Sequence, residues 1–138
     1  MLEVGPFRIL NAIVCDDARR EDNGKAILIG VYTGSILISR FPAQMQLAVW
    51  IEHEVTKIGN FQFSCRIILD DELEIFQVTG DALLNELAPG VLAFGGVPLQ
   101  LQRPGSLKVE LRIAEEEWTT VRTISIIKGQ APTGAVNF

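Results

Sequence analysis

Histidine is almost absent from this 138-residue sequence, which contains only His53, and cysteine occurs only twice. A single histidine excludes metal sites built from several histidines and most histidine-based catalytic triads. Pairing of His53 with Cys15 or Cys65 as a nucleophile would need a spatial coincidence that no local motif supports. We therefore expect His53 to point inward near the end of its strand, as a hydrogen-bonded structural residue.

Positive charge and cofactor motifs are also scarce. Twelve Lys and Arg residues against 17 Asp and Glu residues give a net charge of −5. The isoelectric point of about 4.8 opposes binding to nucleic acid or to anionic membranes. The sequence has no CxxC pair, no glycine-rich phosphate loop and no nucleophile elbow. It therefore predicts no catalytic residue, no enzyme and no cofactor.

Long apolar runs are missing as well. The longest uncharged run extends from Leu87 up to Arg103, and two prolines and three glycines interrupt it, which excludes a membrane-spanning helix. The first residues, MLEVGPF, lack the basic start and the apolar segment of a secretory signal, so a cytoplasmic location is expected. Cys15 and Cys65 fall on the apolar phase of predicted strands and should be buried thiols. A disulfide between them stays open as the alternative if their strands are neighbours.

Alternation of apolar and polar residues is abundant and predicts β-strands. It is clearest over residues 44–55 and 60–69, which we expect to form a hairpin. Residues 7–15 and 26–32 are apolar on both faces, which predicts a central hairpin that other strands cover on both arms. The charged loop between these arms, residues 16–25, contains Asn23-Gly24, a dipeptide that favours a turn. Further elements are a short strand at 35–38, strands at 73–79, 97–101, 107–113 and 118–127, and one or two helical turns within 80–90.

These elements predict an all-β fold: an antiparallel two-sheet sandwich of immunoglobulin or C2 type, with eight or nine strands and one short helix. A closed eight-stranded barrel is the alternative. Residues 1–127 should form a single domain and residues 128–138 a flexible tail. The core should include Leu47, Val49, Phe63, Ile67, Val109 and Leu111.

Several short motifs follow one another along the chain: Cys15-Asp16-Asp17-x-Arg19, Gly24-Lys25, Leu28-x-Gly30-x-Tyr32, Phe41-Pro42 and Pro104-Gly105. In this order they resemble a family of small bacterial proteins that is catalogued only as uncharacterised. The resemblance covers most of the domain and implies a β-sandwich of bacterial origin. It implies no established activity, so no functional residue follows from it.

Two acidic clusters are the only groups dense enough to suggest a metal site. Their candidate ligands are Asp16, Asp17, Asp22, Asp70 and Asp71. Calcium takes six to eight oxygen ligands from such loops, but neither cluster has the EF-hand spacing, and Arg19, Arg20 and Arg66 can neutralise the acids. Charged, solvated turns are therefore the favoured interpretation. Because the strand at 35–38 spans only about 13 Å, we expect a partial edge strand there, which separates the clusters and leaves no shared cation site.

The function that these patterns favour is a non-enzymatic interaction or assembly module, which binds an unidentified protein or a second copy of itself. Trp50 and Ile68, expected on the solvent-facing sides of their strands, are the candidate contact residues. A position for Trp50 beneath the short helix is the alternative. The alternative function is a calcium-dependent binding domain that uses the acidic loops at the end of the sandwich.

Overall fold

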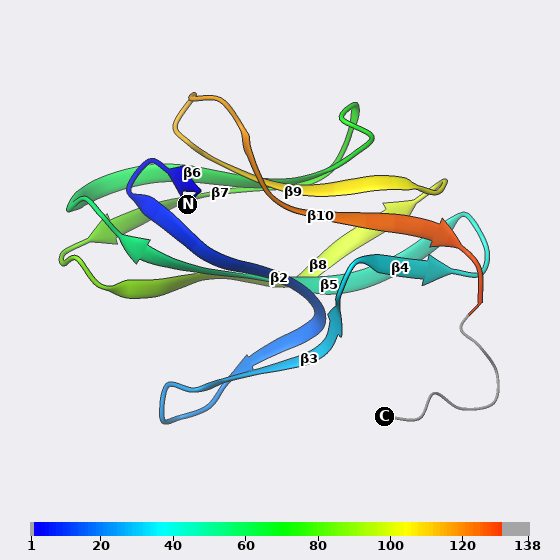
Figure 1. The fold of residues 1–138 in the computed structure, drawn as a ribbon, viewed down its shortest axis with the longest axis horizontal. Helices are drawn as coiled ribbons and strands as arrows, with labels where there is room; N and C mark the ends of the chain where they lie inside the picture. Colours follow the sequence, from blue (N-terminus) through cyan, green and yellow to red (C-terminus); the bar gives the residue numbers. More distant parts are fainter. Residues whose placement is uncertain (1, 131–138) are drawn as a thin grey trace.

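Two five-stranded β-sheets stack on each other in the computed structural model of the chain, which describes residues 2–130 (Figure 1). The strands are β1 (Glu3–Val4), β2 (Phe7–Arg20), β3 (Ala26–Tyr32), β4 (Ser35–Ile38), β5 (Ala43–Val55), β6 (Gly59–Leu69), β7 (Leu73–Leu84), β8 (Pro89–Leu101), β9 (Gly105–Ile113) and β10 (Thr119–Lys128). Residues 2–130 contain no helix, and thus none that could cross a membrane. The predicted sandwich is confirmed, and the sheets do not close into a barrel.

The chain crosses between the sheets after β3, β4, β5, β7 and β8. Sheet A has the order β1-β2-β5-β8, with β3 paired to β2, and sheet B has the order β4-β10-β9-β6-β7. All pairs are antiparallel except β4 with β10, in which Ser35 lies beside Ser125 in a parallel register. The predicted short strand at 35–38 is confirmed as an edge strand of sheet B.

The core lies between the facing sides of the two sheets. The six predicted core residues are all buried, so the strand registers inferred from alternation are confirmed. In β5, Leu47, Val49 and Ile51 point into this core, whereas Ala48 and Trp50 point to the opposite face of sheet A. Burial on both faces makes β5 the central strand of its sheet.

The helical turns predicted within residues 80–90 are not formed. β7 continues to Leu84, and β8 begins at Pro89 after a short turn. Ala82 and Leu84 pack against the core while Leu83 between them is 70% exposed. The alternation of a strand therefore continues through this segment, and the exposed Leu83 gave it the appearance of a helical stripe.

The end of β10 corrects the predicted start of the C-terminal tail. Lys128 belongs to β10 and pairs with Ile38 of β4. The backbone N–H of Gly129 donates a hydrogen bond to the Ile38 carbonyl at 3.0 Å. A flexible tail from residue 128 onward is therefore wrong for these two residues, and residues 131–138 of the predicted tail lie outside the described residues.

Candidate functional site

The distal half of the β2–β3 hairpin leaves sheet A as a two-stranded arm, which we call the projecting hairpin (residues 16–31). β2 pairs with β5 only from Phe7 to Cys15, and beyond Cys15 it pairs with β3 alone. Figure 1 shows the arm turning away from sheet A on the side opposite sheet B. The predicted hairpin exists, but residues 16–20 belong to β2 and not to a loop. The expectation that other strands cover both arms is wrong for this half.

A bend at Gly30 interrupts the ladder of the projecting hairpin. Gly30 has a φ of +67°, and the paired positions in the ladder skip Gly30 and Asp16. A Cβ atom at Gly30 would collide with the Asp16 carboxylate, so both the backbone and this neighbour require glycine. The Tyr32 hydroxyl donates a hydrogen bond to Asp16 Oδ1, and burial together with this bond raises the pKa of Tyr32 to about 12. These three residues hold the bend.

The tip of the projecting hairpin closes through the turn that Asn23-Gly24 predicts. The N–H of Glu21 donates to the carbonyl of Lys25 at 2.8 Å, and the N–H of Lys25 donates to Asn23 Oδ1 at 3.1 Å. Gly24 takes a φ of +85°, which glycine adopts without strain. The Glu21–Lys25 bond fixes which backbone groups of β3 point toward β2.

β3 presents a free backbone edge, because among the described residues it pairs only with β2. Residues of an antiparallel ladder point their N–H and C=O groups alternately toward and away from the partner strand. Since the carbonyl of Lys25 is bonded to Glu21, the residue that follows β2, Ile27 and Ile29 also point their backbone groups toward β2. Ala26 and Leu28 therefore point theirs outward, where another strand could bind them.

The side chains of β3 add an apolar stripe to this edge. Ile27, Ile29 and Val31 share one face and are 43%, 44% and 48% exposed. Across the ladder, Ile27 and Ile29 lie beside Arg19 and Asp17. This pairing is the signal that sequence reasoning missed: a strand whose partner carries charges at alternate positions does not lie inside the core.

The other sheet edges carry features that discourage pairing with a further strand. β1 has two residues and β4 has four, β8 contains Pro89 and Pro98, and β7 carries Glu74 and Asp81. Short length, proline and charge are the common means by which proteins protect sheet edges. β3 contains neither a charged residue nor a proline over Ala26–Tyr32. Among the edges of the described sheets, β3 is the unprotected one.

Trp50 and Ile68, the predicted contact residues, are only 7% and 5% exposed. The Arg20 guanidinium of the projecting hairpin lies 5.7 Å from the Trp50 ring centre, and the Trp50 indole donates to Glu52 Oε1 at 3.3 Å. The expectation that both side chains face solvent is therefore wrong, and Arg20 rather than a helix covers Trp50. This cation–π contact ties the projecting hairpin to β5.

The first acidic cluster lies along the projecting hairpin. Asp16 accepts the Tyr32 hydroxyl, and Asp17 pairs with Arg19 at 2.9 Å. The hydrogen bond from Arg19 lowers the pKa of the Asp17 carboxyl. Asp22 stands apart from both in the turn at the tip, so the three candidate ligands do not converge.

The second acidic cluster lies at the turn between β6 and β7, which Figure 1 places on the opposite side of the molecule from the projecting hairpin. Asp70 accepts the Ser106 N–H at 2.9 Å and pairs with Arg103 at 3.3 Å, which lowers the pKa of Asp70. Asp71 pairs with Lys108 at 2.8 Å. Within residues 2–130, no group of three or more His, Cys, Asp or Glu side chains could hold a metal ion.

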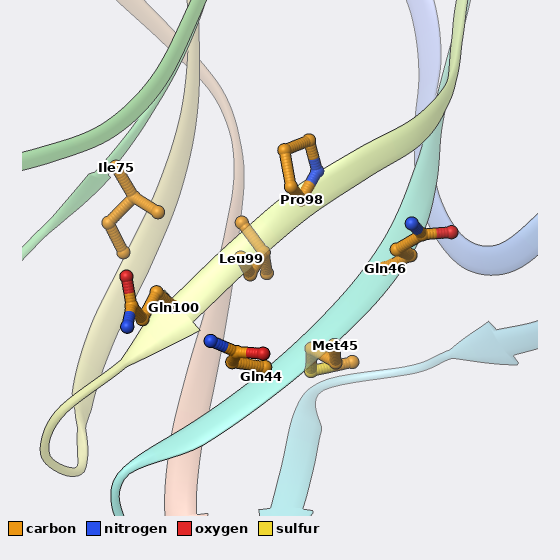
Figure 2. Close-up of a pocket in the computed structure, with 7 residues that line it drawn as sticks. All are labelled: Gln44, Met45, Gln46, Ile75, Pro98, Leu99 and Gln100. Carbon is orange, nitrogen blue, oxygen red and sulfur yellow. The ribbon is translucent and has the colours of Figure 1, made fainter.

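A groove of about 520 Å³ runs along the paired ends of β5 and β8 and reaches β7 (Figure 2). Its lining residues are Gln44, Met45, Gln46, Ile75, Pro98, Leu99 and Gln100. Figure 2 shows Ile75 approaching from the other sheet, near Gln100. This lining contains no acid, base or nucleophile, so the groove can bind a neutral group but supplies no reactive one.

His53 lies beside a second cavity of about 490 Å³, whose rim includes Asp81 and Glu86. Its ring is buried and lies 4.5 Å from the Phe7 ring, and a Cβ atom at Gly90 would approach His53 Cε1 to 2.8 Å. The predicted inward position is confirmed, and within residues 2–130 His53 Nδ1 has no hydrogen-bond partner. Burial lowers the pKa of His53.

Cys15 and Cys65 are both buried and unpaired. Cys15 is in sheet A and Cys65 in sheet B, so their strands are not neighbours and the condition for a disulfide is not met. Burial raises the pKa of both thiols, that of Cys65 to about 12. Neither thiol is therefore prepared to act as a thiolate nucleophile.

A family model matches residues 10–126, from near the start of β2 almost to the end of β10, and its description is a family of unknown function, DUF6941. The chain belongs to this family. The resemblance to an uncharacterised family is thereby confirmed, and the match includes the whole projecting hairpin of this DUF6941 protein. No curated protein matches the chain. The description of the family names no activity.

Proposed function

We propose that this DUF6941 protein is a non-enzymatic interaction module, which binds its partner by pairing β3 with a strand of that partner. The observation that carries the proposal is the unprotected edge of β3. The outward backbone groups of Ala26 and Leu28 and the exposed side chains of Ile27 and Ile29 lie together on a segment that projects from the sandwich. A projecting edge meets a partner without rearrangement of the core.

Strand addition uses the backbone and the side chains for different purposes. Each new hydrogen bond along the edge contributes about 0.5–1.5 kcal/mol to binding. The alternate side chains of the incoming strand pack beside Ile27 and Ile29, and this packing selects the partner. The incoming strand should therefore be extended, uncharged at alternate positions and rich in β-branched residues.

The non-enzymatic part of the proposal is supported by the way that the candidate reactive groups are held. Asp70 is paired with Arg103, Asp71 with Lys108, and the Cys65 thiol is kept protonated by burial. The His53 ring packs against Phe7 in the interior. Side chains held in these ways are poorly placed to exchange protons with a substrate or to attack one.

We further propose that the protein is bacterial and acts in the cytoplasm. The resemblance of its motifs to a bacterial family supports the origin. The unpaired, buried Cys15 and Cys65 suit a reducing compartment. Fractionation of cells that express the native gene tests the location, and recovery outside the cytoplasm contradicts it.

Selection of displayed peptides on the immobilised protein tests the proposed strand addition. Enriched peptides should alternate apolar and polar residues, and they should bind at least about tenfold more weakly to the Leu28→Pro and Ile29→Lys variants. Leu28→Pro removes an outward N–H, and Ile29→Lys charges the apolar stripe. The matched control is Ile127→Lys, because Ile127 is also 44% exposed but lies in β10, which has neighbours on both edges.

Two results contradict the proposed function. One is the failure of any peptide to be enriched on the wild-type protein. The other is equal loss of binding in Ile29→Lys and Ile127→Lys, which would indicate a general effect of added charge. Circular dichroism and thermal melting of each variant show that the fold is retained.

A further inference from the structure

We propose that the strand which pairs with β3 is β3 of a second copy of this chain, in an antiparallel register centred on Ile27. This inference rests on the proposed function and names its partner. A two-fold axis then passes beside Ile27, so that the two Ile27 residues face each other. In the same register Ala26 of each copy lies opposite Leu28 of the other, and Lys25 lies opposite Ile29.

The direction of the backbone groups supports this register. Hydrogen bonds between two edges form only where outward groups of one strand meet outward groups of the other. The backbone N–H and C=O groups of Ala26 and Leu28 point outward from β3. In this arrangement Ala26 of each copy pairs with Leu28 of the other, so that two such pairs form. The two pairs supply about four interchain backbone hydrogen bonds. Ile27 then occupies a pair without hydrogen bonds, in which facing side chains lie closest.

The bend at Gly30 confines the pairing to residues 25–29. A φ of +67° at Gly30 interrupts the extended backbone, so a register centred on Ile29 would run through the bend in both copies. The register centred on Ile27 ends one residue before Gly30. It therefore uses the regular part of β3 and leaves the contacts among Asp16, Gly30 and Tyr32 intact.

Charge complementarity favours a second copy over a foreign strand. Lys25, Ile27 and Ile29 share one face of β3, and Asp17 lies beside Ile29 in the neighbouring strand β2. When Lys25 of one copy stands opposite Ile29 of the other, it is two strand spacings, about 10 Å, from Asp17 of that copy. A lysine side chain reaches across Ile29 to this carboxylate. Because the dimer has a two-fold axis, this pair of Lys25 with Asp17 of the other copy forms twice.

The low net charge of the projecting hairpin permits this approach. Residues 16–31 contain four acids and three bases, whereas the whole chain has a net charge of −5. The acids are Asp16, Asp17, Glu21 and Asp22, and the bases are Arg19, Arg20 and Lys25. Two copies that meet at β3 therefore bring together segments that each carry a net charge of only −1, and they keep the acidic turns of sheet B apart.

Sedimentation over a concentration series up to about 1 mM tests the self-pairing, because an interface this short gives a weak dimer. The average mass of the wild type should rise from 15.2 kDa toward twice that value. Ile27→Lys places two ammonium groups opposite each other and should abolish the rise. Ile127→Lys, which adds the same charge to a strand with two neighbours, should leave it unchanged.

Two cysteine variants test the register. Under mild oxidation by oxidised glutathione, Ile27→Cys should form an interchain disulfide, because directly facing pairs without hydrogen bonds have the required Cα separation. Ile29→Cys should not, because the two Ile29 residues are offset along the strands in this register. The native thiols are buried and should stay reduced.

An exchange of charges between Lys25 and Asp17 tests whether the partner strand belongs to a second copy of the chain. Lys25→Asp should weaken the dimer by placing its carboxylate beside Asp17 of the other copy, and Asp17→Lys in the same chain should restore it. A foreign partner strand would not show this restoration.

The outcomes separate this inference from the proposed function. A wild-type monomer at all concentrations, or a disulfide in Ile29→Cys and not in Ile27→Cys, overturns the inference. If displayed peptides still bind at β3 in the first case, the proposed function stands without self-pairing. If the protein stays monomeric and selects no peptide, both fail.

Discussion

β5 and β3 are both apolar strands of sheet A, yet β5 is buried on both faces at its centre and β3 is largely exposed. Five consecutive residues of β5, from Leu47 to Ile51, are buried. In β3, the aliphatic side chains of Ile27, Ile29 and Val31 remain more than two-fifths exposed. β5 has neighbours on both edges, and β3 has one neighbour on one edge. Apolar composition therefore predicts a strand, but the number of its partners decides whether it is covered.

The largest difference between these regions should appear when core and projecting side chains are shortened. Leu111→Ala should lower the free energy of unfolding by about 2–5 kcal/mol and Phe63→Ala by about 3–5 kcal/mol, because each leaves a cavity between the sheets. Ile29→Ala should cost less than about 1 kcal/mol in the monomer. Chemical denaturation of dilute samples measures all three. Near-neutral values for Leu111→Ala and Phe63→Ala would contradict the core described above.

A second comparison concerns the bend of the projecting hairpin. Gly30→Ala should cost about 1–3 kcal/mol, because alanine at this φ is strained and its Cβ collides with Asp16. The matched control is Gly34→Ala, since nothing lies within 4 Å of a Cβ atom there. Equal melting temperatures of the two variants would show that the bend does not depend on glycine.

As the pH falls, folding stability should be lost in the sandwich body before it is lost in the projecting hairpin. Burial lowers the pKa of His53 in the folded state below its ordinary value of 6.5. The unfolded chain therefore binds the proton first as the pH falls, and folding stability present above pH 6.5 should decline below it, by at most about 1.4 kcal/mol per pH unit. Unfolding of the wild type and of His53→Gln between pH 7 and 5 measures this slope. A wild-type slope equal to that of His53→Gln would contradict it.

The smallest expected effect is that of calcium. The two acidic clusters lie on opposite sides of the molecule, and Asp70 and Asp71 are already paired with basic side chains. Millimolar calcium should therefore leave the melting temperature unchanged. A rise of several degrees, lost in the Asp16→Asn, Asp70→Asn double variant, would instead support a calcium-dependent binding domain, because a ligand of the folded state raises its stability.

Sequence reasoning succeeded where a strand lies in the middle of a sheet. The alternation in β5 and β6 determined both the strands and the faces that form the core, because apolar residues recur at every second position on the core-facing side of each strand. Sequence reasoning failed for β3, which it expected to be covered, because the strands that would cover β3 do not extend beside it. It also failed at Leu83, because a single exposed leucine imitates helical spacing when no neighbouring strand is known.

The candidate site was the part of the molecule least accessible to prediction. Trp50 was expected to face solvent because polar residues alternate around it, but Arg20 covers it from a segment 30 residues earlier in the chain. The exposed edge of β3 is defined by the bend at Gly30 and by the missing neighbour on one side. The bend involves Asp16 of β2 as well as Gly30, and the missing neighbour is a property of the whole sheet.

The pairing of β4 with β10 has a consequence for synthesis on the ribosome. Ser35 lies beside Ser125, 90 residues later in the chain, and β10 is the only neighbour of β4 among the ten described strands. The β2–β3 hairpin can close as soon as Tyr32 has emerged, whereas β4 must wait until nearly the whole chain has been made. During that interval β4, which carries the core residue Ile36, has no strand to pair with. Docking of β10 is thus expected to be a late step of folding, because contacts between distant segments form slowly.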